Sequence, residues 1–126
     1  MSRIIFHSFS DVERDDKRDL RRRATRALKL RRLRSEIFGT AISKEAAWEM
    51  LLALYANGRR LTVTELSATT EAPGTTALRW IDFLESRNLV SREASSTDLR
   101  INYINLTDQG VQLMEKYLVA MLVVQP

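Results

Sequence analysis

Thr75, Thr76 and Arg79 form the first group of residues whose types and spacing could do chemistry. They follow Pro73, which suits the first turn of a helix, so both threonines belong to a helix N-terminus. Hydroxyl and backbone N–H groups there can bind phosphate oxygens, and an arginine one turn later can form two hydrogen bonds with guanine. The group therefore predicts a helix that enters the major groove of DNA.

The same residues also have a purely structural interpretation. Thr75 and Thr76 are then solvated residues of a first helical turn, and Arg79 pairs with Asp82 or Glu85 along its own helix. The choice between the two interpretations depends on the elements that follow.

A second candidate is the arginine in STDLRINYINLTDQG, residues 96–110. Asp98 and Arg100 stand two residues apart, ahead of apolar residues typical of a strand, and Thr107 then suits the start of a helix. Arg100 is therefore expected at or beside the tip of a hairpin. A charge at an exposed tip either is simply solvated or contacts something outside the fold.

Other kinds of chemistry find little support in the composition. The 126 residues include no cysteine and one histidine, His7, which excludes a disulfide framework and a thiolate or histidine-cluster metal site. There is no glycine-rich phosphate loop, so we expect neither an enzyme nor a cofactor. No apolar run approaches the roughly 20 residues of a membrane span, and the N-terminus lacks the apolar stretch of a signal peptide, so a cytoplasmic protein without membrane contact is expected.

The positive charge is concentrated near the N-terminus. Residues 1–37 hold 12 of the 20 basic and 6 of the 16 acidic residues, a balance of +6, which leaves −2 for residues 38–126. The stretch from Arg21 to Arg34 contains eight basic residues and no acidic one. It can be a dimerising helix with a solvated basic face, an arm along DNA, or a helix that meets a membrane surface or an acidic partner.

Local signals divide the chain into elements. Residues 11–38 contain no Gly or Pro and predict a long helix that ends at Gly39. Its apolar residues form two rows on different faces, so the helix bends or its halves meet different partners. Ser43 is expected to cap a helix buried on several sides, and Thr62 with Glu65 predicts a capping box at the start of a short helix.

The remaining chain predicts a fourth helix after Pro73, a two-stranded hairpin made of LVSREA and RINYINL, and a last helix that starts at Thr107. The expected fold is mainly α with a small β hairpin. We divide it into an N-terminal arm and long basic helix (1–38), a winged helix-turn-helix domain (43–106) and a C-terminal helix (107–126).

This order of elements resembles the winged helix-turn-helix of the multiple-antibiotic-resistance regulator (MarR-type) family, from about Ala47 to Leu118. The most specific part is D-x-R followed by five residues and L-T-x-x-G, which here is formed by Asp98, Arg100, Leu106, Thr107 and Gly110. The resemblance implies a homodimeric DNA-binding regulator. It also implies that Arg100 enters the minor groove, whose narrow form has a strongly negative potential, while Asp98 helps to hold it. The alternative is an exposed Asp98–Arg100 pair that only stabilises the turn.

The expected function is therefore a homodimeric, sequence-specific transcriptional regulator, acting as a repressor on double-stranded DNA. Its candidate DNA-binding residues are Thr64, Thr75, Thr76, Arg79, Arg92, Asp98 and Arg100. Additional phosphate affinity is expected from Arg59, Arg60 and the basic N-terminal segment.

Dimerisation is expected through the N- and C-terminal helices, because the stripe of Met114, Leu118 and Met121 or Leu122 needs cover. Members of the family often sense ligands, so a small-molecule effector is a further expected partner. No residue in the sequence indicates where its pocket would be. Leu78, Phe83 and Leu99 depart from the family pattern and support an alternative: a winged-helix module that binds protein through this apolar surface.

Overall fold

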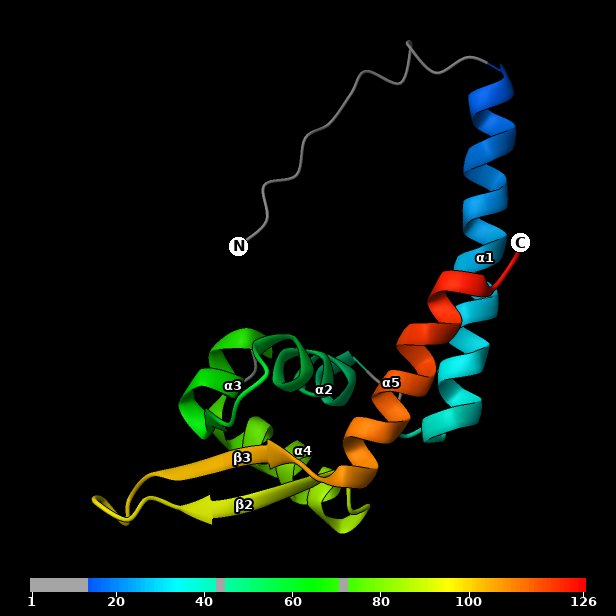
Figure 1. Cartoon of the computed structure of the whole chain (residues 1–126). Helices are drawn as coiled ribbons and strands as arrows, with labels where there is room; N and C mark the ends of the chain where they lie inside the picture. Colours follow the sequence, from blue (N-terminus) through cyan, green and yellow to red (C-terminus); the bar gives the residue numbers. More distant parts are fainter. Residues whose placement is uncertain (1–13, 43–44, 71–72) are drawn as a thin grey trace.

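The computed structural model describes residues 14–42, 45–70 and 73–126. The N-terminal arm with His7 and the expected cap Ser43 lie outside the described residues. Figure 1 shows two long helices side by side next to a group of shorter helices and a small sheet. The elements are α1 (Arg14–Phe38), α2 (Glu45–Asn57), β1 (Leu61–Thr62), α3 (Val63–Thr70), α4 (Gly74–Ser86), β2 (Val90–Ala94), β3 (Asn102–Leu106) and α5 (Asp108–Val123).

The two halves of α1 have different surroundings. Leu30 is buried and Leu33 packs against the core in the second half, where α1 lies along α5. Leu20 and Leu28, from the other apolar row, remain about half exposed. The helix ends at Gly39, whose φ of 87° is a left-handed conformation that glycine adopts without steric cost. The second half of α1 thus meets α5 and the core, whereas a partner for the other apolar row stays a prediction.

Helix α2 is the centre of the core, as its sequence predicts. Met50 and Leu51 are completely buried. The Trp48 ring makes edge contacts with Phe38 of α1 and Tyr117 of α5, at centroid distances of 5.4 and 4.9 Å. Such aromatic pairs add stability beyond the area they bury, so Trp48 ties both long helices to α2.

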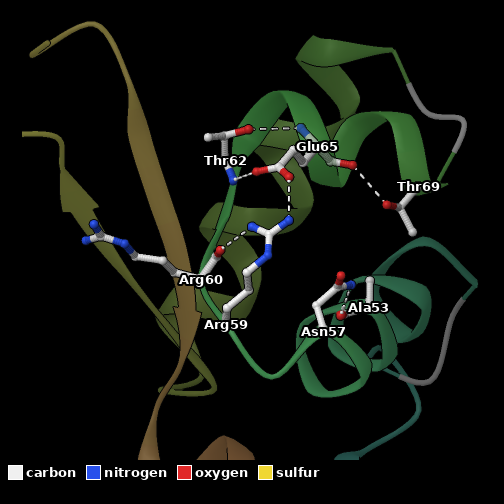
Figure 2. A network of polar contacts seen from close by, with 7 residues as sticks. All are labelled: Ala53, Asn57, Arg59, Arg60, Thr62, Glu65 and Thr69. Atoms are coloured by element: carbon white, nitrogen blue, oxygen red, sulfur yellow. Dashed lines mark hydrogen bonds and ion pairs between the residues drawn. The ribbon is translucent and has the colours of Figure 1, made fainter.

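The predicted capping box forms at the start of α3. The Thr62 N–H donates to Glu65 Oε1 at 2.9 Å, and the Glu65 N–H donates to Thr62 Oγ1 at 3.1 Å (Figure 2). Arg59 adds a bond from its guanidinium to Glu65 Oε2 at 2.9 Å. These donors, the Arg59 guanidinium first, lower the pKa of Glu65 to about 2.

This network predicts a pH dependence of stability. Because the pKa of Glu65 is lower in the folded chain than in the unfolded chain, its contribution is fully present above about pH 4.5 and is lost as the pH falls toward 2. We expect Glu65→Gln to lower the urea midpoint more at pH 6 than at pH 2.5. Equal shifts of the midpoint at both pH values would show that the carboxylate charge is unimportant.

The sheet has one strand more than the expected hairpin. β1 pairs antiparallel with β3, with Leu61 opposite Ile104, and the strand order is β1-β3-β2. Two residues are too few to show the alternation that identifies a strand, so the sequence could not reveal β1. Because β1 pairs with β3 and leads directly into α3, it places the start of α3 beside the hairpin.

The last helix begins as predicted. Thr107 is its N-cap, and its hydroxyl accepts a hydrogen bond from the Gly110 N–H at 2.9 Å. Met114 and Tyr117 are buried against the core, whereas Val119, Leu122 and Val123 are exposed. The expected stripe is thus partly covered within the chain, because Met114 packs inside the core and Leu118 and Met121 lie against it.

Candidate nucleic-acid interface

Helix α4 buries one face and presents the opposite one. Ala77, Ile81 and Leu84 are buried against the core. At about 100° per residue, Thr75 and Arg79 lie on the far side of the helix from these three, and both are exposed. The structure thus brings these two predicted residues together on an open surface.

Thr76 lies on a flank of α4 and is half-buried. It lines a cavity of about 470 Å³ together with Ala41, Arg79, Trp80 and Phe83. The Trp80 and Phe83 rings meet edge to face at a centroid distance of 6.0 Å. Arg79 therefore borders both the open face of α4 and this aromatic cavity.

The acids that could have neutralised Arg79 are occupied elsewhere. Asp82 and Glu85 both pair with Arg92 of β2, with Glu85 Oε1 at 3.4 Å from the guanidinium. Within the described residues, Arg79 forms no ion pair with either acid. The structural alternative, in which Arg79 pairs along its own helix, is therefore not the arrangement that the fold adopts.

Arg92, a predicted DNA contact, is occupied by these two ion pairs. Its side chain is 27% exposed and joins the first wing strand to α4. Its role as a DNA contact stays a prediction, and the geometry gives it a structural role as well, because its ion pairs join β2 to α4.

Arg100 stands at the tip of the wing in a defined orientation. Its Nε and a terminal nitrogen each donate to an Asp98 carboxylate oxygen at 2.9 Å, and its backbone N–H donates to Asp98 Oδ1 at 3.0 Å. The Arg100 side chain is 90% exposed. These hydrogen bonds lower the pKa of Asp98 and raise that of Arg100, so both groups are charged at neutral pH.

The loop that carries Arg100 is organised by a buried hydroxyl that sequence reasoning missed. Ser95 Oγ accepts hydrogen bonds from the N–H groups of Thr97 and Asp98, each at 3.2 Å. The Ile101 N–H donates to the Asp98 carbonyl at 3.0 Å and closes a tight turn around Leu99 and Arg100. Serine followed by Thr and Asp is a turn signal that could have suggested this role.

A groove connects the wing to the two helices of the helix-turn-helix. Its volume is about 470 Å³. It is lined by Thr62, Val63, Thr64, Leu78, Arg100, Ile101 and Asn102. Thr64 and Arg100, predicted from separate parts of the sequence, thus border one surface feature.

The apolar departures do not make one contact surface. Leu78 faces the wing groove and is 40% exposed, whereas Phe83 lies in the aromatic cavity on another flank of α4 and packs against the core. Leu99 projects from the wing tip and is 81% exposed. A protein partner that uses all three residues would have to contact both flanks of α4 as well as the wing tip.

The two arginines before β1, which were expected to add phosphate affinity, both have partners within the protein. Arg59 pairs with Glu65, and Arg60 pairs with Glu93 at 3.0 Å while its guanidinium lies 4.0 Å from the centroid of the Tyr103 ring. Figure 2 shows the Arg60 side chain directed away from the Arg59–Glu65 network. Any contribution from these residues to phosphate binding must compete with these internal partners.

Metal chemistry has no visible basis in the described part of the chain, which contains no group of three or more His, Cys, Asp or Glu residues suited to an ion. Among the described helices, none is long and apolar enough to cross a bilayer.

Solved structures share this fold. S. aureus MepR in a complex with DNA matches with a TM-score of 0.68 and 22% identity, over 79% of this chain and 77% of that chain. YusO of Bacillus subtilis matches with a TM-score of 0.67 and 23% identity, over 94% and 81%. AbsC of Streptomyces coelicolor, a MarR family transcriptional regulator, matches with a TM-score of 0.61 and 20% identity, over 89% and 76%.

Comparison by sequence gave a different result: no protein-family model and no curated protein matched the chain. The chain has the winged-helix fold of the MarR-type regulators, which confirms the fold class and the resemblance expected from its sequence. At these identities the likeness establishes the fold, and the function has to be argued from the site.

Proposed function

We propose that the protein is a homodimeric transcriptional regulator that binds double-stranded DNA and represses transcription. Helix α4 occupies the major groove, with Thr75 and Thr76 near phosphates and Arg79 on a base, and Arg100 occupies the adjacent minor groove. The observation that carries the proposal is the exposed Arg100 guanidinium, held by two hydrogen bonds to Asp98 beside the open face of α4. The DNA complex of MepR, a protein of the same fold, supports it.

The arrangement of charge suits a narrow groove. Asp98 orients the Arg100 guanidinium, which lowers the entropy that is lost when the side chain is immobilised on DNA. A narrow minor groove attracts a guanidinium without base-specific hydrogen bonds. We therefore propose that Arg79 recognises the base sequence, whereas Arg100 adds affinity and favours sites with a narrow minor groove.

A homodimer is supported by apolar side chains that remain exposed on the two long helices. On α1 these are Leu20 and Leu28, and on α5 they are Val119, Leu122 and Val123. The Arg26 Nε–H donates to the Val124 carbonyl at 3.0 Å, so the end of α5 lies beside the middle of α1. A second copy would cover this surface and would place two recognition helices in successive major grooves, about 34 Å apart.

The aromatic cavity beside α4 is the structural candidate for an effector site. Its rings suit a flat apolar group, and Arg79 suits an anionic substituent. A ligand bound there would engage the arginine that we assign to base recognition, so DNA and ligand would compete for Arg79.

Selection of bound duplexes from a random pool tests the proposal. We expect a pseudo-palindromic sequence with half-sites one helical turn apart. Absence of measurable duplex binding at low salt would overturn the proposal and favour the protein-binding alternative.

The selected duplex also tests the role of Arg79. We expect Arg79→Ala to weaken binding of the selected duplex roughly tenfold to a hundredfold, the discrimination carried by one bidentate base contact, and to change binding of a random duplex much less. Arg23→Ala removes an equal charge from the exposed surface of α1 and serves as the control. An equal loss on both duplexes for Arg79→Ala would refute its role in base recognition.

A further inference from the structure

The exposed side of α1 carries a row of positive charge away from the proposed DNA interface. We name it the basic stripe. Its members are Arg18, Arg21, Arg22, Lys29 and Arg32. All five side chains are exposed. At about 100° per residue, they occupy an arc of roughly 100° on the helix surface.

The basic stripe lies between the other two faces of α1. The centre of the core face, with Leu30 and Leu33, lies roughly 100° to one side of the centre of the stripe, and the centre of the apolar row of Leu20 and Leu28 lies roughly 110° to the other. Leu28 lies roughly 20° from Arg21 and lines one cavity with Arg32, so these two arginines border the apolar row. A second copy that covers the apolar row therefore leaves Arg18, Arg22 and Lys29 open, because they lie roughly 80° or more from Leu28. Like charges also prevent two stripes from packing on each other.

The positive charge of the basic stripe is only partly offset on its own side of α1, where Glu36 stands four residues after Arg32. Among the described side chains, none of its five members forms an ion pair. Like charges three or four residues apart, such as Arg18 with Arg21 and Arg22, destabilise a helix. The stripe is thus a surface whose charge is complementary to an anionic partner.

The chemistry of the stripe favours phosphodiester groups. Four of its five members are arginines, whose planar guanidinium groups bind phosphate oxygens with two parallel hydrogen bonds. From Arg18 to Arg32 it is about 21 Å long. The exposed apolar residues of the same half, Leu20 and Leu28, include no aromatic side chain to anchor a membrane interface.

The stripe lies too far from the wing to contact the same short stretch of DNA as the winged helix. Figure 1 shows the start of α1 at the opposite end of the molecule from the wing tip. We propose that the basic stripe of α1 binds the backbone of a second duplex DNA segment, so that one protein molecule holds two segments together. This inference rests on the proposed function, because the winged helix has to hold the first segment. Once one part of a duplex is held, a second part of the DNA has a higher effective concentration at the stripe.

A capture experiment tests the inference. The full-length protein is bound to a duplex on beads, and retention of a second, fluorescent duplex is measured. For the stripe variant Arg18→Gln/Arg22→Gln/Lys29→Gln, we expect retention of the second duplex to fall roughly tenfold, because three phosphate contacts are lost, while binding to the bead duplex changes little.

A matched variant controls for net charge. Arg23→Glu/Arg87→Gln lowers the net charge by the same three units at exposed positions outside both the stripe and the apolar rows, and it is expected to capture the second duplex like wild type. Circular dichroism checks that both variants are folded. Unchanged capture by the stripe variant, or equal loss in both variants, would overturn the inference.

Two further arms separate the causes of failure. If the winged helix does not bind DNA, Arg79→Ala/Arg100→Ala will bind the bead duplex like wild type, which refutes the proposed function. If the stripe variant also loses the bead duplex, the stripe is the first DNA contact and the inference of two segments held together is overturned. If the stripe instead recognises lipid, the wild-type protein will bind phosphatidylglycerol vesicles in a stripe-dependent manner without capturing a second duplex. That result would overturn the inference.

Discussion

Replacing Gly110 with alanine is expected to lower the free energy of unfolding by about 3 kcal/mol, near the upper end of the cost of overpacking a core. A Cβ atom at this position would lie 2.3 Å from the Leu89 carbonyl oxygen and 3.3 Å from Leu106 Cδ2. The first distance is far inside van der Waals contact, and the atom concerned belongs to the backbone.

The surrounding hydrogen bonds prevent an easy adjustment. The Leu89 carbonyl accepts a bond from the Thr107 N–H at 3.0 Å, and the Thr107 hydroxyl donates to the Asn88 carbonyl at 2.6 Å. Because the first turn of α5 and the start of β2 are joined in this way, moving either one breaks the N-cap of α5. The strain therefore falls on the junction between the wing and the last helix.

Urea unfolding measures the effect, and Gly74→Ala is the matched control. A Cβ atom added at Gly74 would meet no heavy atom within 4 Å, and this glycine begins α4 without a positive φ. Alanine there should leave stability unchanged or raise it by up to about 1 kcal/mol. A Gly110→Ala variant as stable as Gly74→Ala would refute the proposed steric cause.

This contact gives a physical reason for a motif that the sequence revealed only as a resemblance. Leu106, Thr107 and Gly110 could be recognised by their spacing, but the need for glycine comes from the Leu89 carbonyl, which belongs to a different element of the fold. The Thr107 cap itself was predictable, since a side-chain bond to the third following residue is local. The capping box of Thr62 and Glu65 was predictable for the same reason.

Features that depend on distant residues escaped the sequence. β1 exists because Leu61 and Thr62 pair with β3, and neither residue has a local signal that identifies a strand. Arg92 looked like an open wing residue until α4 brought Asp82 and Glu85 to it. The candidate site was therefore predictable in its residue types and helix spacing, whereas the partners of each charge required the fold.

The second large effect is expected at the wing. Arg100→Ala should weaken binding of the selected duplex at least tenfold and reduce the slope of log affinity against log salt by about 0.9, the value for one phosphate-like contact. The reason is that the Arg100 guanidinium is exposed at the wing tip and its neighbour Asp98 holds it in a fixed orientation. Fluorescence anisotropy across a salt series measures both quantities.

Substitution of Asp98 tests whether Arg100 acts through its fixed orientation or only through its positive charge. If only net charge matters, Asp98→Ala makes the wing more positive and should strengthen DNA binding. If orientation matters, the same substitution should weaken binding, because Arg100 loses both side-chain bonds and the tight turn loses the acceptor for its Arg100 N–H. We expect the weakening.

Asp19→Ala provides the comparison, since it removes an exposed negative charge from α1 without touching the wing. It should leave affinity unchanged or raise it slightly. Asp98→Asn should fall between Asp98→Ala and wild type, because its amide oxygen can still accept the Arg100 N–H but cannot pair with the guanidinium as a carboxylate does. Tighter binding by Asp98→Ala than by wild type would show that the wing acts through its charge alone, and the Asp98–Arg100 pair would then be only a stabilised turn.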